Sequence, residues 1–170
     1  MKAITVSQPF AQLVACGLKT NDSKGWSTVH RGLLAIHSSV SFPLRVRQLC
    51  ASEPFKSALL KRNPYFAEWD WLPKDSLAFP LGYILAYAEL VDVRRTEDFK
   101  PSGAERRFGN YGPGRFVWLL ANVKPLKVPV RTVGALGLWD WQPRTESAVE
   151  SEQEATEEFV ASESGDAGEA

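Results

Sequence analysis

Residues 7–26 read SQPFAQLVACGLKTNDSKGW, an apolar run that stops at a glycine and leads into a charged turn. The apolar residues recur at helical spacing and predict a short helix with one apolar face. Those residues are Phe10, Leu13 and Val14. Ser7 is the expected N-cap of this helix. Gly17 is its expected end, because glycine readily adopts the left-handed conformation that closes a helix.

The remainder of this stretch, Leu18–Trp26, is polar and irregular, which predicts a segment running across the surface. Two cations, Lys19 and Lys24, flank Asp22. Such a group can bind a phosphate while the carboxylate orients Lys19, or it can form an exposed ion-pair cluster that contributes little to stability. Burial and Lys24 would lower the pKa of Lys19, whereas Asp22 would raise it. The sequence leaves both alternatives open.

Before and after residues 7–26, strand-like segments are separated by turns. Helices are expected after the first and the second of these strands. The expected strands are Lys2–Val6, Gly32–His37, Leu81–Val93, Arg115–Leu120 and Val123–Val130, and Gly134–Trp141 closes the expected globular part. The expected helices after the second strand are Pro43–Ala51 and Phe55–Arg62. Pro125 and Pro129 predict an edge or a bend. This order predicts an α+β fold, a small β-barrel with a helix after strand 1 and a helical insert after strand 2.

Charge divides the 170-residue chain into two parts although the total is balanced. Residues 1–143 contain 19 basic and 11 acidic residues, a net charge of +8, and form the expected globular domain. Residues 144–170 contain nine acidic residues and one basic residue, and their composition predicts a disordered tail. A basic domain attracts polyanions through phosphate contacts, although the same charge can be a solvated surface. The tail is a candidate competitor for polyanions at the basic face.

Several classes of protein are disfavoured. No apolar run is long enough for a transmembrane helix, and the N-terminus lacks the apolar core of a secretion signal, so we expect no membrane partner and a cytoplasmic location. Cys16 and Cys50 are far apart and resemble small buried residues. Neither His30 nor His37 has ligand spacing to a carboxylate or thiol, so we expect no metal, and no cofactor motif is present. His37 is expected to be a hydrogen-bonded structural residue.

Two further groups of residues are candidates for binding. Trp26 can offer a stacking surface for a base or can simply pack on the barrel. A glycine-rich basic loop, Pro101–Gly114, precedes a strand and can contact a nucleic-acid backbone or be an ordinary hairpin loop. The relevant side chains in and after this loop are Arg106, Arg107, Tyr111 and Arg115.

Taken together, these segments resemble the ASCH domain, a family of PUA-like barrels named for homology to the C-terminal part of activating signal cointegrator 1. Its hallmark, Gly-x-Lys-x-x-Glu-x-Arg with a following Trp, corresponds to Gly17, Lys19, Asp22, Lys24 and Trp26. The resemblance covers residues 2–141. It also includes SQPFA at 7–11, RGL at 31–33, IH at 36–37, FPLG at 79–82, LVD at 90–92, RFVWL at 115–119 and GLW at 137–139.

The resemblance implies a cleft beside the first helix and a role in binding or processing RNA or nucleosides. Some small ASCH proteins are amidohydrolases acting on N4-acetylcytidine, with the motif lysine, a Thr and a Glu proposed as catalytic, and a ribonuclease activity is also proposed. The lysine corresponds to Lys19 and the Thr position to Asp22. No motif places the Glu, for which Glu89 and Glu105 are candidates. Asp22 is shorter than Glu, and Lys24 lacks the bidentate fork of Arg, which favours anion binding over catalysis.

The leading hypothesis is therefore a protein that binds RNA or other single-stranded nucleic acid in a basic cleft beside the first helix. The residues expected at this site are Lys19, Lys24, Trp26, Arg31, Arg106, Arg107, Tyr111 and Arg115. An amidohydrolase acting on an acylated nucleoside, with Lys19 and Asp22 as catalytic residues, is the first alternative, beside a nuclease. A protein-interaction module is the second.

Overall fold

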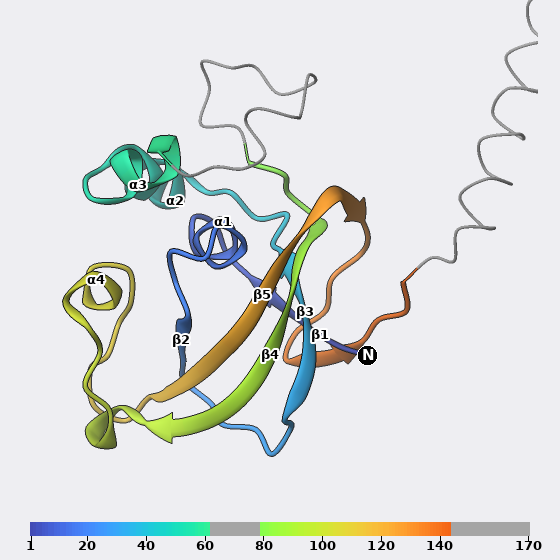
Figure 1. The fold of residues 1–170 in the computed structure, drawn as a ribbon. Helices are drawn as coiled ribbons and strands as arrows, with labels where there is room; N and C mark the ends of the chain where they lie inside the picture. Colours follow the sequence, from blue (N-terminus) through green and yellow to red (C-terminus); the bar gives the residue numbers. More distant parts are fainter. Residues whose placement is uncertain (62–78, 144–170) are drawn as a thin grey trace, which may run out of the picture.

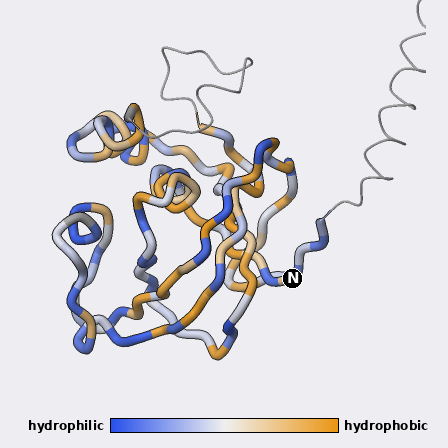
Figure 2. Tube along the Cα trace, in the orientation of Figure 1, coloured by the Kyte–Doolittle hydropathy of each residue, from blue (hydrophilic) through white to orange (hydrophobic). Residues whose placement is uncertain are grey.

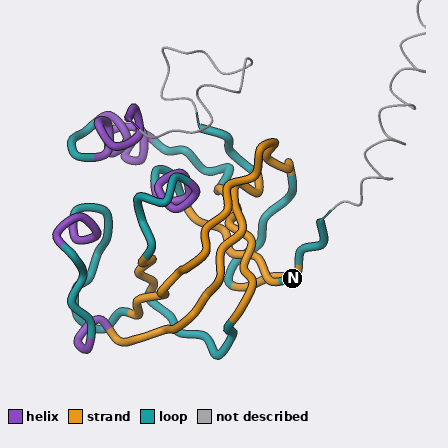
Figure 3. The backbone as a smooth tube through the Cα atoms, in the orientation of Figure 1, coloured by secondary structure: helices purple, strands orange, loops and turns teal. Residues whose placement is uncertain are grey.

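The computed structural model describes residues 1–61 and 79–143, in which six strands form one sheet and the helices are grouped at one side of it (Figures 1 and 3). The strands are β1 (Lys2–Val6), β2 (Asn21–Lys24), β3 (Gly32–Ser38), β4 (Tyr83–Arg95), β5 (Phe116–Arg131) and β6 (Leu138–Asp140). The helices are α1 (Phe10–Ala15), α2 (Leu44–Ala51), α3 (Phe55–Lys61), the 3₁₀ turn η1 (Thr96–Asp98) and α4 (Gly103–Arg106). The described part of the chain is therefore an α+β protein.

The strand order is β2-β5-β4-β3-β1-β6. β1 and β3 are parallel and pair Ile4 with Ile36, whereas the other neighbours are antiparallel. β4 and β5 form the longest pair, and its register shifts near Asn122, a residue with positive φ (50°). β2 pairs with the first residues of β5 only, so the second half of β5, which carries both prolines, borders β4 on one side. This agrees with the expected edge or bend at these prolines.

Helix α1 ends as the sequence predicts but begins differently. Gly17 has φ +67°, its N–H donates to Val14 O, and the N–H of Leu18 donates to Leu13 O. These two bonds are those of a Schellman motif. The predicted N-cap was wrong, because Pro9 occupies the N-cap position and Ser7 makes no side-chain cap. The side chain of Gln8 instead accepts the hydrogen bond of the Gln12 N–H at 3.1 Å.

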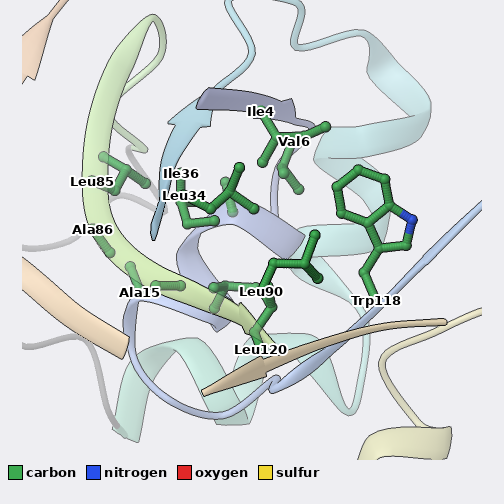
Figure 4. Close-up of a cluster of buried hydrophobic side chains, with 13 residues drawn as sticks. Ile4, Val6, Ala15, Leu34, Ile36, Leu85, Ala86, Leu90, Trp118 and Leu120 are labelled. Carbon is green, nitrogen blue, oxygen red and sulfur yellow. The ribbon is translucent and has the colours of Figure 1, made fainter. Parts of the chain in front are cut away.

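Helix α1 lies between the sheet and the α2–α3 pair (Figure 1), and it is buried on every side rather than on one face. Ala11, Val14 and Ala15 pack into a cluster with strand residues (Figure 4). Leu13 packs on the other side into a second cluster, which contains Cys50 of α2 and Leu59 of α3. Burial of this apolar surface is the main force that holds the helix on the sheet.

The sequence predicted β1 at its observed bounds, β3 and α2 to within one residue at each end, and the start of α3 at Phe55, whereas its predicted end, Arg62, lies outside the described residues. Three predictions were wrong. Leu18–Trp26 is not simply a surface segment, because it contains β2. The strands expected at Arg115–Leu120 and Val123–Val130 form one continuous strand, β5. The basic loop contains the short helix α4, and the chain from the end of β4 to α4 is largely hydrophilic (Figure 2).

The predicted disordered tail, residues 144–170, lies outside the described residues, as does the segment 62–78. Within the ranges that are described, no helix has the length and apolarity required to cross a membrane.

Candidate functional site

Strand β2 lies at one edge of the sheet, and side chains occupy the carbonyl groups on its open side. Thr20 O accepts a hydrogen bond from Leu120 of β5, so the carbonyls of Asn21 and Ser23 point away from β5. Asn21 O accepts hydrogen bonds from Lys19 Nζ and, at 3.2 Å, from the Tyr111 hydroxyl. Ser23 O accepts one from Arg115 Nη2 at 2.9 Å. This polar strand is therefore held by β5 on one side and by side chains on the other.

Lys19 is buried, with 1% of its surface exposed. Its Nζ atom lies 5.9 Å from the Phe10 ring centroid and 5.7 Å from that of Tyr111. No carboxylate of the described residues forms an ion pair with it. Burial lowers the pKa of Lys19, and the charges of Asp22 and Glu105 oppose that effect without cancelling it. Burial is therefore the larger of the opposing effects on the pKa of Lys19, whose relative size the sequence left open.

Glu105, on α4, is hydrogen-bonded to the residues at the start of β2 and to Tyr111. Its Oε1 atom accepts hydrogen bonds from the Thr20 hydroxyl at 2.8 Å, the Thr20 N–H and the Asn21 N–H. Its Oε2 atom accepts one from the Tyr111 hydroxyl at 3.2 Å. Burial and the Glu105 charge raise the pKa of Tyr111, so this hydroxyl stays protonated as a donor. Lys19, Glu105 and Tyr111 are called the buried cluster below.

A cleft of about 490 Å³ adjoins β2. It is lined by residues of β1, β2 and the segment before β6, together with Trp26, Arg115 and the start of α1. β2 is at one end of the strand order and β1 and β6 are at the other. The sheet is therefore curved so strongly that its two edges face each other across the cleft. Lys19 is not among the lining residues.

Inside the cleft, Asp22 and Lys24 form an ion pair with a separation of 2.8 Å. Both side chains are 13% exposed, and Lys24 Nζ lies 5.6 Å from the ring of the buried Trp118. An ammonium group has three donors, so Lys24 can bind an anion while it keeps Asp22. Trp26 packs edge-on against Trp118 at 4.7 Å and is 38% exposed. Trp26 therefore packs against the sheet, as one of its two predicted roles requires, and stays partly exposed.

Arg115 lines the cleft and also supports β2. Besides Ser23 O, its guanidinium donates to Asn110 O at 3.2 Å. Both partners are neutral carbonyls, and no carboxylate in residues 1–61 or 79–143 forms an ion pair with it. The positive charge of Arg115 is therefore uncompensated by a direct partner at the wall of the cleft.

The other predicted binding residues lie elsewhere. Arg31 is exposed and forms an ion pair with Asp92 at 3.3 Å. Arg106 and Tyr111 line a separate pocket of about 350 Å³. Arg107 is exposed on the chain after α4 and lines neither the cleft nor this pocket. The structure thus brings Asp22, Lys24, Trp26 and Arg115 together and separates them from this second group.

His37 is a hydrogen-bonded structural residue, as the sequence predicts. It is buried, with Nδ1 3.1 Å from the Thr5 hydroxyl and Nε2 3.2 Å from Thr132 O. Burial lowers its pKa and favours the neutral ring. Cys16 and Cys50 are free thiols, and the described residues contain no group of acidic, His and Cys side chains able to hold a metal ion.

Comparison with protein-family models and with curated protein sequences found no match to this chain. The interpretation of the site therefore depends on its geometry. The sequence identified Glu105 only as one of two candidates for the glutamate that would act together with Lys19. The other, Glu89, is bonded to Asn122 at 2.8 Å on an exposed part of the sheet. No local signal identifies Glu105, because it lies 85 residues from Thr20.

Proposed function

We propose that the protein binds single-stranded RNA, or a related nucleic acid, in the cleft between β1, β2 and the segment before β6, and that its sheet is the curved barrel of an ASCH-like, PUA-like domain. The observation that carries the proposal is the convergence of Lys24, Arg115 and the exposed ring of Trp26 on one cavity. Cations contact phosphates and an accessible aromatic ring stacks on a base, which is the usual composition of sequence-tolerant single-strand sites. The net charge of +8 over residues 1–143 adds long-range attraction.

In this proposal Lys19 does not contact the ligand. It is buried and donates to the Asn21 carbonyl, whereas Lys24 and Arg115 face the ligand. Asp22 orients Lys24 rather than Lys19, because the ion pair joins Asp22 to Lys24.

The test is a titration of the full chain with a labelled single-stranded RNA at several salt concentrations. We expect binding that weakens steeply with salt, and a slope of log K against log salt that falls by roughly 0.7 for each phosphate contact removed. Lys24→Gln removes such a contact and should weaken binding about tenfold. Lys124→Gln is the matched control, because Lys124 is exposed on β5 and does not line the cleft. No binding at low salt would refute the proposal.

A second candidate, an amidohydrolase acting on an acylated nucleoside, is favoured by one observation. Lys19 has a pKa lowered by burial and lies within electrostatic range of Asp22 and Glu105. A neutral lysine amine can act as a base or nucleophile. This candidate requires turnover of N4-acetylcytidine by the wild-type protein and loss of that turnover in Lys19→Met. Turnover that survives the substitution would exclude Lys19 as the catalytic group.

A further inference from the structure

A second cavity, of about 780 Å³, adjoins the cleft. The two cavities share four lining residues: Thr5, Ser39, Ala135 and Leu136. Leu136 is 98% exposed, so it stands at the boundary between them without being packed into the core. The two cavities therefore adjoin each other. Together they are called the groove below, with Lys24 and Arg115 beside one cavity and the second half of β5 beside the other.

The second cavity has an apolar wall and one cation. Val40, Leu81 and Trp141 line it, and Val40 is largely exposed. Arg131 supplies the charge, with its guanidinium 6.0 Å from the Tyr83 ring centroid. No carboxylate within the described ranges pairs with Arg131. This composition suits flat apolar groups with a phosphate nearby.

Polar side chains that line the second cavity, Thr5 and His37, are already hydrogen-bonded. Thr5 donates to Ala135 O at 2.9 Å and is bonded to His37, whose other ring nitrogen faces Thr132 O. Trp139 Nε1 also donates to the Thr5 hydroxyl, at 3.3 Å. With these groups satisfied, this wall offers a binding surface rather than a set of reactive groups.

We propose that the ligand is an oligonucleotide that occupies both cavities and crosses between them at Leu136. This inference depends on the proposed function and specifies its ligand. Each cavity alone falls in the range of about 300–1,000 Å³ that holds a small molecule, so a mononucleotide fills one and leaves the other empty. A strand places phosphates near Arg115 and Arg131, at the two ends of the groove, and bases against the apolar surfaces between them.

An oligonucleotide explains the groove better than an apolar peptide does. A peptide would use the apolar wall but leave the uncompensated charges of Arg115 and Arg131 without partners. A polyanion uses both, and the domain around them is basic overall. The expected ligand is therefore several nucleotides long, and its affinity depends on residues of the second cavity.

The test compares fluorescein-labelled uridine monophosphate with labelled tetra- and octauridylate. We expect the octanucleotide to bind the wild-type protein at least about tenfold more tightly than the mononucleotide, because additional bases stack in the second cavity. Val133→Glu places a carboxylate in that cavity alone and should remove most of this gain while leaving mononucleotide binding unchanged. Arg131→Gln should act in the same direction, with a smaller effect.

The matched control is Val128→Glu. Val133 and Val128 are 91% and 78% exposed, so neither substitution should disturb folding, and Val128 lines neither cavity. Unchanged octanucleotide binding in both Val133→Glu and Arg131→Gln, together with weaker binding in Lys24→Gln, would overturn the two-cavity groove and leave the cleft as the site. Equal affinity for the mononucleotide and the octanucleotide would also overturn it. Failure of every nucleotide to bind would refute the proposed function itself.

Discussion

Lys19 and Lys24 flank the same short strand, yet their ammonium groups lie in different environments. Lys19 is buried and donates to the Asn21 carbonyl on the open edge of β2. Lys24 lies in the cleft, paired with Asp22. The two residues have the same chemistry, so the surroundings of each ammonium group determine its role. The protein around Lys19 shields it from a ligand, whereas Lys24 can meet a ligand in the cleft.

The largest expected effect is a loss of stability from a substitution in the buried cluster. Glu105→Ala removes the acceptor of the Thr20 and Asn21 N–H groups, together with one of the two carboxylate charges, Asp22 and Glu105, that favour the protonated form of Lys19. We expect a loss of about 3 kcal/mol in the free energy of unfolding, from unpaired buried polar groups. Glu105→Gln keeps an acceptor and should lose less than half as much. Urea denaturation of the two variants measures this, and equal losses would show that the hydrogen bonds to Glu105 are unimportant.

Arg115 lines the cleft and also supports β2, so its substitution can distinguish an effect on ligand binding from an effect on stability. Arg115→Gln should weaken RNA binding about tenfold and cost about 1 kcal/mol of stability, through the bonds to Ser23 O and Asn110 O. Arg115→Lys keeps the charge but not the fork, so it should retain most of the binding while still losing stability. Paired titrations and unfolding curves test this. Equal binding losses in the two variants would assign the effect to β2 rather than to charge.

A smaller change in the free energy of unfolding, of opposite sign, is expected from substitution of Lys19. Because burial lowers its pKa below the ordinary value of 10.5, the folded state binds fewer protons than the unfolded state. The contribution of Lys19 to stability therefore rises with pH between its lowered pKa and 10.5. Lys19→Met removes that dependence and should be neutral or stabilising by up to about 1 kcal/mol at pH 7. Tyr111 still donates to Asn21 O in this variant.

The measurement is the difference in unfolding free energy between wild type and Lys19→Met at pH 7.5 and 9.5. This difference isolates Lys19 from the other groups that titrate in the same range. We expect wild type to gain relative to the variant at the higher pH. A loss of several kcal/mol in Lys19→Met at both values would contradict the account, because it would mean that the charged lysine stabilises the fold.

The smallest expected effect concerns the acidic residues 144–170. We expect their nine acidic side chains to compete with RNA for the basic residues of positions 1–143 on electrostatic grounds. A chain ending at residue 143 should bind RNA a few-fold more tightly at low salt. The difference should vanish near 1 M salt, where the Debye length falls to about 3 Å. Equal affinity of the two chains at low salt would exclude this competition.

Local patterns in the sequence were sufficient for the elements whose signals are local. The apolar β-branched run of β1 and the glycine that ends α1 are examples, because propensity and helix-end chemistry act within a few residues. The pattern Gly-x-Lys-x-x-Glu-x-Arg with a following Trp also identified Asp22, Lys24 and Trp26 as candidates, and all three line the cleft.

The parts of the fold and of the site that the sequence did not predict depend on contacts between residues far apart in the chain. β2 has the sequence NDSK, which has low strand propensity, and forms because β5 pairs with it and side chains cover its open edge. The burial of Lys19 depends on Glu105 and Tyr111, about 90 residues away, which no periodicity in the sequence connects to it. The second half of the groove was missed for the same reason, since residues of β1, β3 and β5 meet there.

The central claim is that the ammonium group of Lys24, in the cleft, binds the ligand, whereas that of the buried Lys19 does not contact it. The most direct measurement is the salt dependence of RNA binding by wild type, Lys24→Gln and Lys19→Met, compared side by side. We predict that Lys24→Gln lowers both the affinity and the slope of log K against log salt, by roughly 0.7, and that Lys19→Met leaves the slope unchanged. The reverse result, with Lys19→Met losing the slope and Lys24→Gln keeping it, would contradict the account.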